Sequence, residues 1–211
     1  MLELIMILET MTLGSFQTNC YIYASSKLKR GFVIDPADKA TYIEQKVREL
    51  QVSVEAIILT HGHADHKHAA LPLASNLGIP IWAHEESLHA LDDRLMHSLL
   101  GFEYVASRPD KTLKDGDIIG EDEIQLKVLH TPGHSQGCIS LLGCGLVFTG
   151  DALFYRSVGR TDFPGGNSYT LTESLKSKLL TLPDETAVYP GHGPDTTIGY
   201  ERKSNPFLRV I

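Results

Sequence analysis

The chain has 211 residues, a formal net charge of −7 and 42% hydrophobic residues. That length and composition fit one soluble domain over residues 1–211 with a sizeable core. The acidic balance and the lack of a long basic block argue against a nucleic-acid or membrane-surface partner, because both need clustered Lys and Arg. The oligomeric state stays open.

The cysteines and the first residues bear on the cellular compartment. Cys20, Cys138 and Cys144 lie in apolar, strand-like context, which favours buried thiols, and an odd number without metal-type pairing suits a reducing cytoplasm. Segment 1–7 contains Glu3 and has neither a basic start nor a cleavage site, so we expect a first strand and no signal peptide. We therefore predict a cytoplasmic protein.

Apolar runs and polar alternation predict the strands. They fall at 4–13, 19–24, 31–34, 55–59, 79–83, 124–129, 138–143, 145–149 and 186–189. Amphipathic spacing predicts helices at 40–50, 68–77 and 168–180, a short helix in the tail after 197, and a helical insertion beside the pocket over 84–110. Each half is a meander followed by a helix-strand unit, which suggests an α/β fold of two sheets packed face to face with helices outside.

The buried strand at 55–59 is followed by a segment rich in histidine. It runs Thr60-His61-Gly62-His63-Ala64-Asp65-His66-Lys67-His68. A loop after a strand can turn several side chains to one point, whereas a regular strand or helix would spread them. Neutral imidazole and carboxylate are ligands for zinc, and also for iron and manganese. The pattern therefore predicts a metal site.

Three later strands each end in a turn with one more candidate ligand. His134, Asp151 and His192 all follow a glycine. With His61, His63, Asp65 and His66 they make seven candidates, which exceeds one tetrahedral zinc and suits two metals that share a bridging carboxylate. Asp35, at the end of the third predicted strand, is either a hydrogen-bond partner of a metal-bound imidazole or a turn cap.

Three more motifs extend the pattern through the chain. They are Thr131-Pro132-Gly133-His134, Phe148-Thr149-Gly150-Asp151 and Tyr189-Pro190-Gly191-His192-Gly193, and a glycine-rich loop, Gly159-Arg160-Thr161-Asp162-Phe163, lies among them. With the histidine segment they resemble the metallo-β-lactamase superfamily over about residues 14–208. The resemblance implies an αββα sandwich of two mixed β-sheets flanked by helices. It also implies that one metal is held by His61, His63 and His134, the other by Asp65, His66 and His192, with Asp151 bridging them.

Two divalent cations, zinc first and iron or manganese as alternatives, would lower the pKa of a bridging water towards neutrality. The chain has no Gly-x-Ser-x-Gly elbow and no cysteine near these motifs, so the predicted nucleophile is that metal-bridging hydroxide. Asp65 is predicted to orient it and to accept its proton. The expected chemistry is metal-assisted hydrolysis.

Within the superfamily, the chain is similar to short glyoxalase II-like hydrolases. The implied substrate is S-D-lactoylglutathione or a related hydroxyacyl thioester, and the chain ends before the C-terminal helical region that holds glutathione in full-length glyoxalase II. We therefore predict no separate glutathione-binding domain. Asp162 stands where an aromatic residue often follows the glycine-basic pair, which leaves the thiol open. Arg160 is either a contact for a substrate carboxylate or a structural loop residue.

Two other functions compete with the thioester hydrolase. Persulfide dioxygenase resembles the chain at 148–153 and 159–163, and its chemistry needs one non-haem iron held by two histidines and a carboxylate. His61, His134 and Asp151 would then be the ligands. A metal-storing or interaction module is the third possibility, and metal binding without turnover would favour it.

Overall fold

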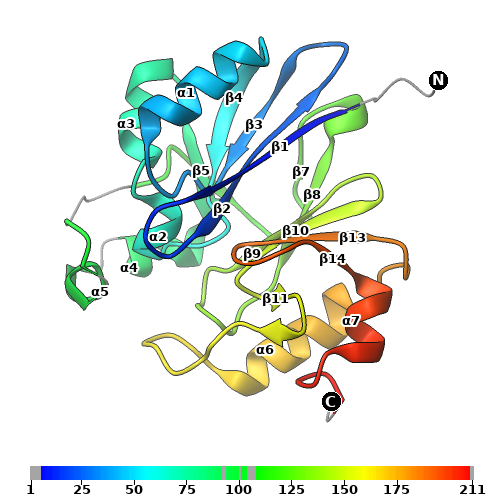
Figure 1. Cartoon of the computed structure of the whole chain (residues 1–211). Coiled ribbons are helices and arrows are strands. Elements are labelled where there is room, and N and C mark those ends of the chain that lie inside the picture. The colour runs from blue at the N-terminus through cyan, green and yellow to red at the C-terminus, as the bar shows by residue number, and fades with distance from the viewer. Residues whose placement is uncertain (1–5, 92–93, 100, 104–107, 210–211) are drawn as a thin grey trace.

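The computed structural model describes residues 6–91, 94–99, 101–103 and 108–209, and two mixed β-sheets stand at the centre of this part of the chain (Figure 1). The first sheet has the order β1-β2-β3-β4-β5-β6. Its strands are β1 (Met6–Leu13), β2 (Thr18–Ser25), β3 (Arg30–Ile34), β4 (Ser53–Ile58), β5 (Ile81–His84) and β6 (Lys111–Leu113).

Connection length explains the pairing in the first sheet. Short turns join β1 to β2 and β2 to β3, and these pairs are antiparallel. The pairs β3/β4 and β4/β5 are parallel, and their connections contain α1 (Ala40–Glu49) or α3 (Ala70–Leu77). A parallel pair needs such a crossover because the chain must return to the other end of the sheet.

The second sheet repeats this plan in the order β14-β13-β10-β9-β8-β7. Its strands are β7 (Ile118–Ile119), β8 (Leu126–His130), β9 (Ile139–Leu142), β10 (Leu146–Gly150), β13 (Ala187–Pro190) and β14 (Thr196–Thr197). The parallel pair β10/β13 is joined through α6 (Ser168–Ser174), which runs on as a π-helical turn, η3 (Leu175–Leu179). A small hairpin of β11 (Leu153–Phe154) and β12 (Ser157–Val158) follows β10, and α7 (Ile198–Ser204) follows β14.

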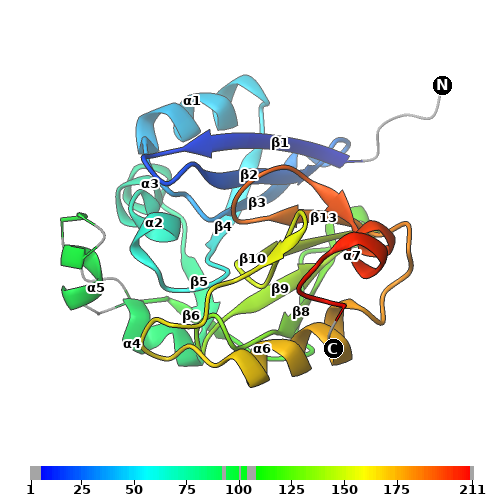
Figure 2. The ribbon, with the colours of Figure 1, turned by 60° about the horizontal axis from the view of Figure 1, so that its bottom comes forward.

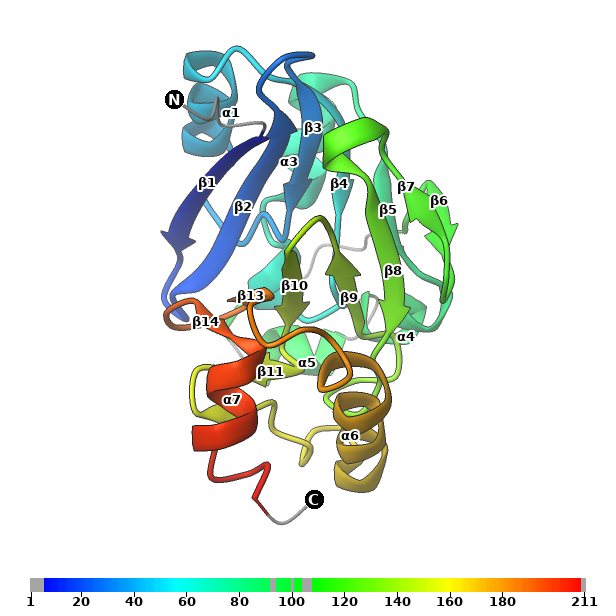
Figure 3. The same ribbon diagram turned by 90° about the vertical axis from the view of Figure 1, so that its right-hand side faces the viewer.

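The layers of the molecule follow from which faces are apolar. Tyr23, Phe32 and Phe148 are fully buried between the two sheets. Ile43 of α1 and Leu73 of α3 pack with the outer face of the first sheet. The views agree that α1 and α3 lie outside the first sheet and that α6 and α7 lie outside the second (Figures 2 and 3). The αββα sandwich of two mixed sheets is confirmed.

The predicted elements agree with this fold apart from a few local differences. Residues 60–68 are not one loop, because a short helix, α2 (Ala64–Lys67), carries Asp65 and His66. The described part of 84–110 contains η1 (Glu85–Ser87), α4 (Leu88–Leu91) and α5 (Arg94–Leu99), so the expected helical insertion is present. A further short helical turn, η2 (Asp122–Ile124), precedes β8. Residues 1–5, 92–93, 100 and 104–107 lie outside the described residues.

Two further findings concern the cysteines and the helices. Cys20 and Cys138 are buried as expected, but the expectation for Cys144 was wrong: it is exposed, because it lies in the turn between β9 and β10. In the part of the chain that the structure describes, no helix has the length and apolarity needed to cross a lipid bilayer.

Candidate metal centre

All seven predicted ligands lie at one edge of the sandwich, just beyond the carboxyl ends of strands. The segment 61–66 follows β4, His134 follows β8, Asp151 follows β10 and His192 follows β13. Because β10 and β13 are parallel neighbours, Asp151 and His192 emerge side by side. The sandwich therefore brings side chains from both sheets to one place.

Asp35 holds the segment from the first sheet. Its Oδ1 accepts a hydrogen bond from the Thr60 N–H at 2.7 Å, and its Oδ2 accepts from Thr60 Oγ1 at 2.6 Å and from Nδ1 of His66 at 2.9 Å. Since the Thr60 hydroxyl donates to the carboxylate, it must accept from Nδ1 of His61, which lies 3.1 Å away. His61 and His66 are thereby fixed in the tautomer that leaves Nε2 unprotonated.

Backbone carbonyls orient the two histidines from the second sheet in the same way. Nδ1 of His134 donates to the carbonyl oxygen of Arg160 at 2.8 Å, and Nδ1 of His192 donates to the carbonyl oxygen of Phe16 at 3.1 Å. A carbonyl oxygen can only accept, so Nε2 is again the nitrogen that carries a free lone pair. In their neutral forms, these four imidazoles thus present the Nε2 lone pair to the site.

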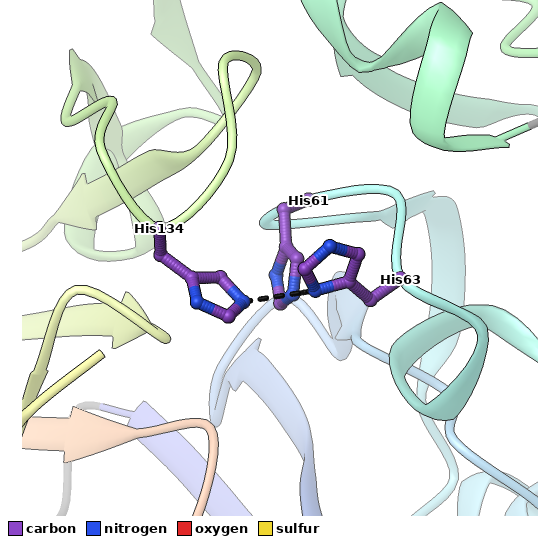
Figure 4. A group of neighbouring side chains, drawn as sticks. All are labelled: His61, His63 and His134. Carbon is purple, nitrogen blue, oxygen red and sulfur yellow. Dashed lines mark hydrogen bonds between the residues drawn. The ribbon is translucent and has the colours of Figure 1, made fainter. Parts of the chain in front are cut away.

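The first ligand group consists of His61, His63 and His134, which point toward one another from two loops (Figure 4). Nδ1 of His63 lies 3.1 Å from Nε2 of His61 and 2.8 Å from Nε2 of His134. All three side chains are buried. Three nitrogens from two loops are the donor set of a tetrahedral metal with one position left for water or substrate.

The second group consists of Asp65, His66 and His192. Nε2 of His192 lies 3.2 Å from Nε2 of His66 and 3.3 Å from Oδ2 of Asp65. Asp151 lies between the two groups: its Oδ1 is 3.2 Å from Nε2 of His66, and its Oδ2 is 3.5 Å from Nε2 of His134. A carboxylate placed in this way can bridge two metals.

The residues present fit a cation at this site. Oδ1 of Asp151 is the buried side-chain nitrogen or oxygen that lacks a hydrogen bond among the residues that the structure describes. Nε2 of His66 and Nε2 of His192 face each other at 3.2 Å, although both carry lone pairs in the tautomers fixed by their outer partners. Lone pairs that converge without a proton between them are satisfied when a metal lies among them.

Comparison with known proteins agrees with this geometry. Residues 13–192 match the metallo-beta-lactamase superfamily. The chain belongs to this superfamily. It is 37% identical to the hydroxyacylglutathione hydrolase GloC of Haemophilus influenzae over 207 residues, which cover 95% of this chain and 97% of that protein.

Two solved structures of the superfamily share the fold over nearly their whole length. The crystal structure of the BLEG-1 B3 metallo-beta-lactamase aligns with a TM-score of 0.90 and 35% identity, over 96% of this chain and all of that chain (100%). The crystal structure of TTHA1623 in a di-iron-bound form aligns with a TM-score of 0.83 and 36% identity, over 95% of this chain and 100% of that chain.

The two ligand groups differ in electrostatics. Burial, with His66 nearby, lowers the pKa of His61 well below its ordinary value, and burial with His134 nearby lowers the pKa of His63 to about 4. For His66 burial acts in the same direction, but the carboxylates of Asp151 and Asp65 outweigh it and raise the pKa well above its ordinary value. His61 and His63 of the first group are therefore held in the neutral form, whereas carboxylates dominate the surroundings of His66 in the second.

A cavity of about 340 Å³ opens above the ligands. Besides His63, Asp65, His134, Asp151 and His192, it is lined by Phe16, Phe154, Val158, Arg160 and Phe163. Three phenylalanines thus form much of the wall, so an apolar part of a substrate would find apolar contacts beside the ligands.

Arg160 lies at this cavity, but its side chain already has a partner. Its Nε and Nη2 donate to the two carboxylate oxygens of Asp162, both at 2.7 Å, and its guanidinium lies 3.8 Å from the centre of the Phe163 ring. The predicted contact with a substrate carboxylate would compete with Asp162. The structure adds a second role, since the Arg160 carbonyl orients His134.

The residues that hold the turn after β13 were not predicted. Nδ2 of Asn19 donates to the carbonyl oxygens of Pro190 and Gly193 at 3.0 and 2.8 Å, and the Tyr21 hydroxyl donates to the Pro190 oxygen at 2.6 Å. Gly191 is required between them, because a Cβ there would collide with Oδ1 of Asp151. The sequence carries no signal for contacts between residues so far apart.

A further group of possible ligands, His84, Glu86 and His130, lies elsewhere. Nδ1 of His84 accepts from the Glu86 N–H at 3.2 Å, so its Nε2 carries the proton. The rings of His84 and His130 are stacked 4.0 Å apart with planes 15° from parallel. A metal could not lie in both ring planes, so this group is a packing contact between β5 and β8.

Proposed function

We propose that the protein is a metal-dependent thioester hydrolase, with S-D-lactoylglutathione or a related hydroxyacyl thioester as substrate. The observation that carries the proposal is the floor of the aromatic cavity, where two ligand groups share Asp151. Similarity to the hydroxyacylglutathione hydrolase GloC supports the substrate class.

His61, His63 and His134 would hold one cation and Asp65, His66 and His192 the other, with Asp151 between them. Bound there, two divalent cations supply a water of lowered pKa and polarise a carbonyl oxygen. Zinc suits this set of nitrogen and carboxylate ligands, and the di-iron form of TTHA1623 supports iron as an alternative.

The side chains of the cavity account for the remaining chemistry. Hydrolysis joins the oxygen of water to the thioester carbonyl carbon and breaks the carbon–sulfur bond, which yields a carboxylic acid and a thiol. Asp65 lines the cavity, and its neighbour His66 outweighs the effect of burial and lowers the pKa of its carboxyl, so it stays ionised. A lowered pKa weakens a carboxylate as a base, so the role of Asp65 rests on its place in the cavity, where it would orient the water, accept its proton and return it to the departing sulfur.

No serine, cysteine or lysine is found among the described residues that line the cavity. Cys138 lies below it, but burial raises the pKa of its thiol to about 12, so the thiolate is scarce at neutral pH. Water is thus the nucleophile that the site offers. This favours direct hydrolysis over a covalent acyl-enzyme route.

The test combines elemental analysis with turnover. Protein purified without added metal is analysed for zinc, iron and manganese, and is assayed with S-D-lactoylglutathione and other acyl thioesters. We expect about two metals per chain, hydrolysis of at least one thioester, and loss of activity on chelation that added metal restores. Failure of the two-metal protein to hydrolyse any thioester would overturn the proposal.

The alternative, persulfide dioxygenase, has a distinct outcome in the same experiment. One iron per chain, with the second position empty even after metal is supplied, together with oxygen uptake on glutathione persulfide, would favour it. Its single-iron ligands would be His61, His134 and Asp151. In the structure these residues belong to a larger set, since His63 and His66 lie equally close to them.

A further inference from the structure

A second cavity of about 540 Å³ adjoins the metal cavity. Val158 and Arg160 line both, and the far wall is formed by Leu171 and Leu175 on α6 and its continuation and by Phe207 near the C-terminus. Phe207 is 53% exposed although it is apolar. The two cavities therefore share a wall, and a substrate whose carbonyl lies at the ligands would reach the second space by passing over the Arg160 side chain, which is 55% exposed.

Residues 158–160 form the partition between the two cavities, and contacts with the ligand-bearing turns hold this segment in place. The Gly159 N–H donates to the carbonyl oxygen of Ala152, and the Arg160 carbonyl accepts from His134. A Cβ at Gly159 would collide with the carbonyl oxygen of Asp151, so the partition packs directly against a ligand-bearing turn. The second cavity is thus held at a constant distance from the reacting atoms.

Charge limits what the second cavity can accept. Among the described residues that line it, Arg160 is the sole cation and Asp162 the sole anion, and they pair with two hydrogen bonds. Arg160 lowers the pKa of Asp162 to about 2, so the pair persists through the neutral range. An anionic substituent there would lack a free cation, whereas apolar surface would meet Leu171, Leu175 and Phe207.

We propose that this cavity receives an uncharged, extended, mainly apolar chain of the thioester substrate. The inference rests on the proposed thioester hydrolysis, and within it favours thioesters with an apolar acyl chain over S-D-lactoylglutathione. The apolar chain is the acyl group, as in a fatty acyl thioester. A pantetheine arm on the thiol side is uncharged but carries two amides and two hydroxyls, so its entry into the cavity is the competing outcome. Glutathione, whose thiol arm carries two carboxylates, fits this cavity less well than either.

Two substrate series test the proposal and separate the two sources. In the first, an acetyl group is carried by N-acetylcysteamine, pantetheine or glutathione, and in the second N-acetylcysteamine carries acyl groups from acetyl to octanoyl. We expect KM to fall by about fourfold for each methylene of the acyl group that enters the cavity. A KM that falls from N-acetylcysteamine to pantetheine but is flat along the acyl series would assign the cavity to the thiol arm instead. A KM that is lowest for the glutathione thioester and flat along both uncharged series would overturn the proposal.

Two matched variants on α6 test whether the dependence of KM on acyl length arises in the second cavity. Thr172 lines the second cavity, and Thr172→Trp should abolish the dependence of KM on chain length. Thr170 lies on the same helix but lines a different groove, so Thr170→Trp should retain that dependence. Circular dichroism and thermal melting check that both variants fold. Equal chain-length dependence in the two variants would contradict the assignment.

A binding measurement separates this inference from the proposed function. Calorimetry with S-octanoyl-N-acetylcysteamine on the Asp151→Asn variant, in which turnover is suppressed, should show binding that Thr172→Trp removes. If no thioester is hydrolysed by the parent protein, the proposed function fails, while this binding still supports an apolar-chain site. If thioesters are hydrolysed but the binding is absent or unaffected by Thr172→Trp, the inference alone fails.

Freeing Arg160 tests the charge argument directly. Asp162→Asn removes the carboxylate that pairs with the guanidinium, so Arg160 becomes available to an anionic arm. We expect KM for the glutathione thioester to fall about tenfold, while KM for the uncharged thioesters stays unchanged. If the ratio of KM for the glutathione thioester to KM for the uncharged thioesters is unchanged, the Arg160–Asp162 pair does not disfavour the charged glutathione arm.

Discussion

The two sheets contribute ligands in different ways. The first sheet supplies four of them from the short segment 61–66, and the single carboxylate of Asp35 holds that segment at both ends through Thr60 and His66. The second sheet supplies His134, Asp151 and His192 from three separate strand ends. The side chain of His66 is fully buried, whereas that of His192 is 27% exposed. The first half of the site is thus a local structure, and the second depends on how the sheets pack.

The largest effect is expected where the two halves meet, at Asp151. Asp151→Asn keeps the shape of the side chain but removes the charge that faces both His66 and His134. We expect the metal content to fall in both groups and thioester hydrolysis to drop by about 10³-fold. Elemental analysis and initial rates measure this. The exposed Asp195→Asn serves as control, and retention of both metals by Asp151→Asn would show that the carboxylate does not bridge.

The same contrast decides how much could be predicted from sequence. Apolar alternation predicts the strands, the likeness of the two halves suggests two packed sheets, and the family resemblance implies the αββα sandwich. The segment 61–66 stands out because its ligands are neighbours along the chain. Their role as metal ligands stays a prediction, but the structure brings all seven together. Asn19 and Gly193 are 174 residues apart, so no local pattern indicates their hydrogen bond. Likewise no spacing shows that Arg160 turns to Asp162 rather than into the cavity.

The next prediction concerns Asp35, whose carboxylate holds the segment 61–66 of the first sheet in place. In Asp35→Asn an amide replaces one of the acceptors that orient His66 and Thr60. We expect metal affinity to fall by about 10–100-fold, since partners that orient ligands have effects of this size. Competition with a chromogenic chelator measures the affinity. Asp38→Asn, a few residues away in an exposed turn, controls for the change of charge, and equal affinities in the two variants would show that Asp35 only caps the turn.

A smaller loss of metal binding, confined to one metal, is expected at Asn19 and Tyr21, which clamp the turn that carries His192. Asn19→Ala leaves the Gly193 carbonyl without its side-chain donor and the Pro190 carbonyl with the Tyr21 hydroxyl alone, so the turn that carries His192 loosens. One metal should dissociate about tenfold more readily while the other is retained, and unfolding should become easier by about 1–3 kcal/mol. Thr12→Val, which removes a contact to Asn19 but keeps the clamp, is the control. Parallel loss of both metals would refute the independence of the two halves.

The smallest effect is expected at Tyr21, whose hydroxyl shares the Pro190 carbonyl with Asn19. Tyr21→Phe removes the hydroxyl that donates to the Pro190 oxygen, but Asn19 still donates to that oxygen. We expect the free energy of unfolding in urea to fall by about 1 kcal/mol or less, with metal content and KM unchanged. The Asn19→Ala/Tyr21→Phe double variant should lose more than the sum of the single variants, because the carbonyl is then left buried without a donor. Strictly additive losses would mean that the two side chains support the His192 turn independently, and that the second half of the site has no shared clamp.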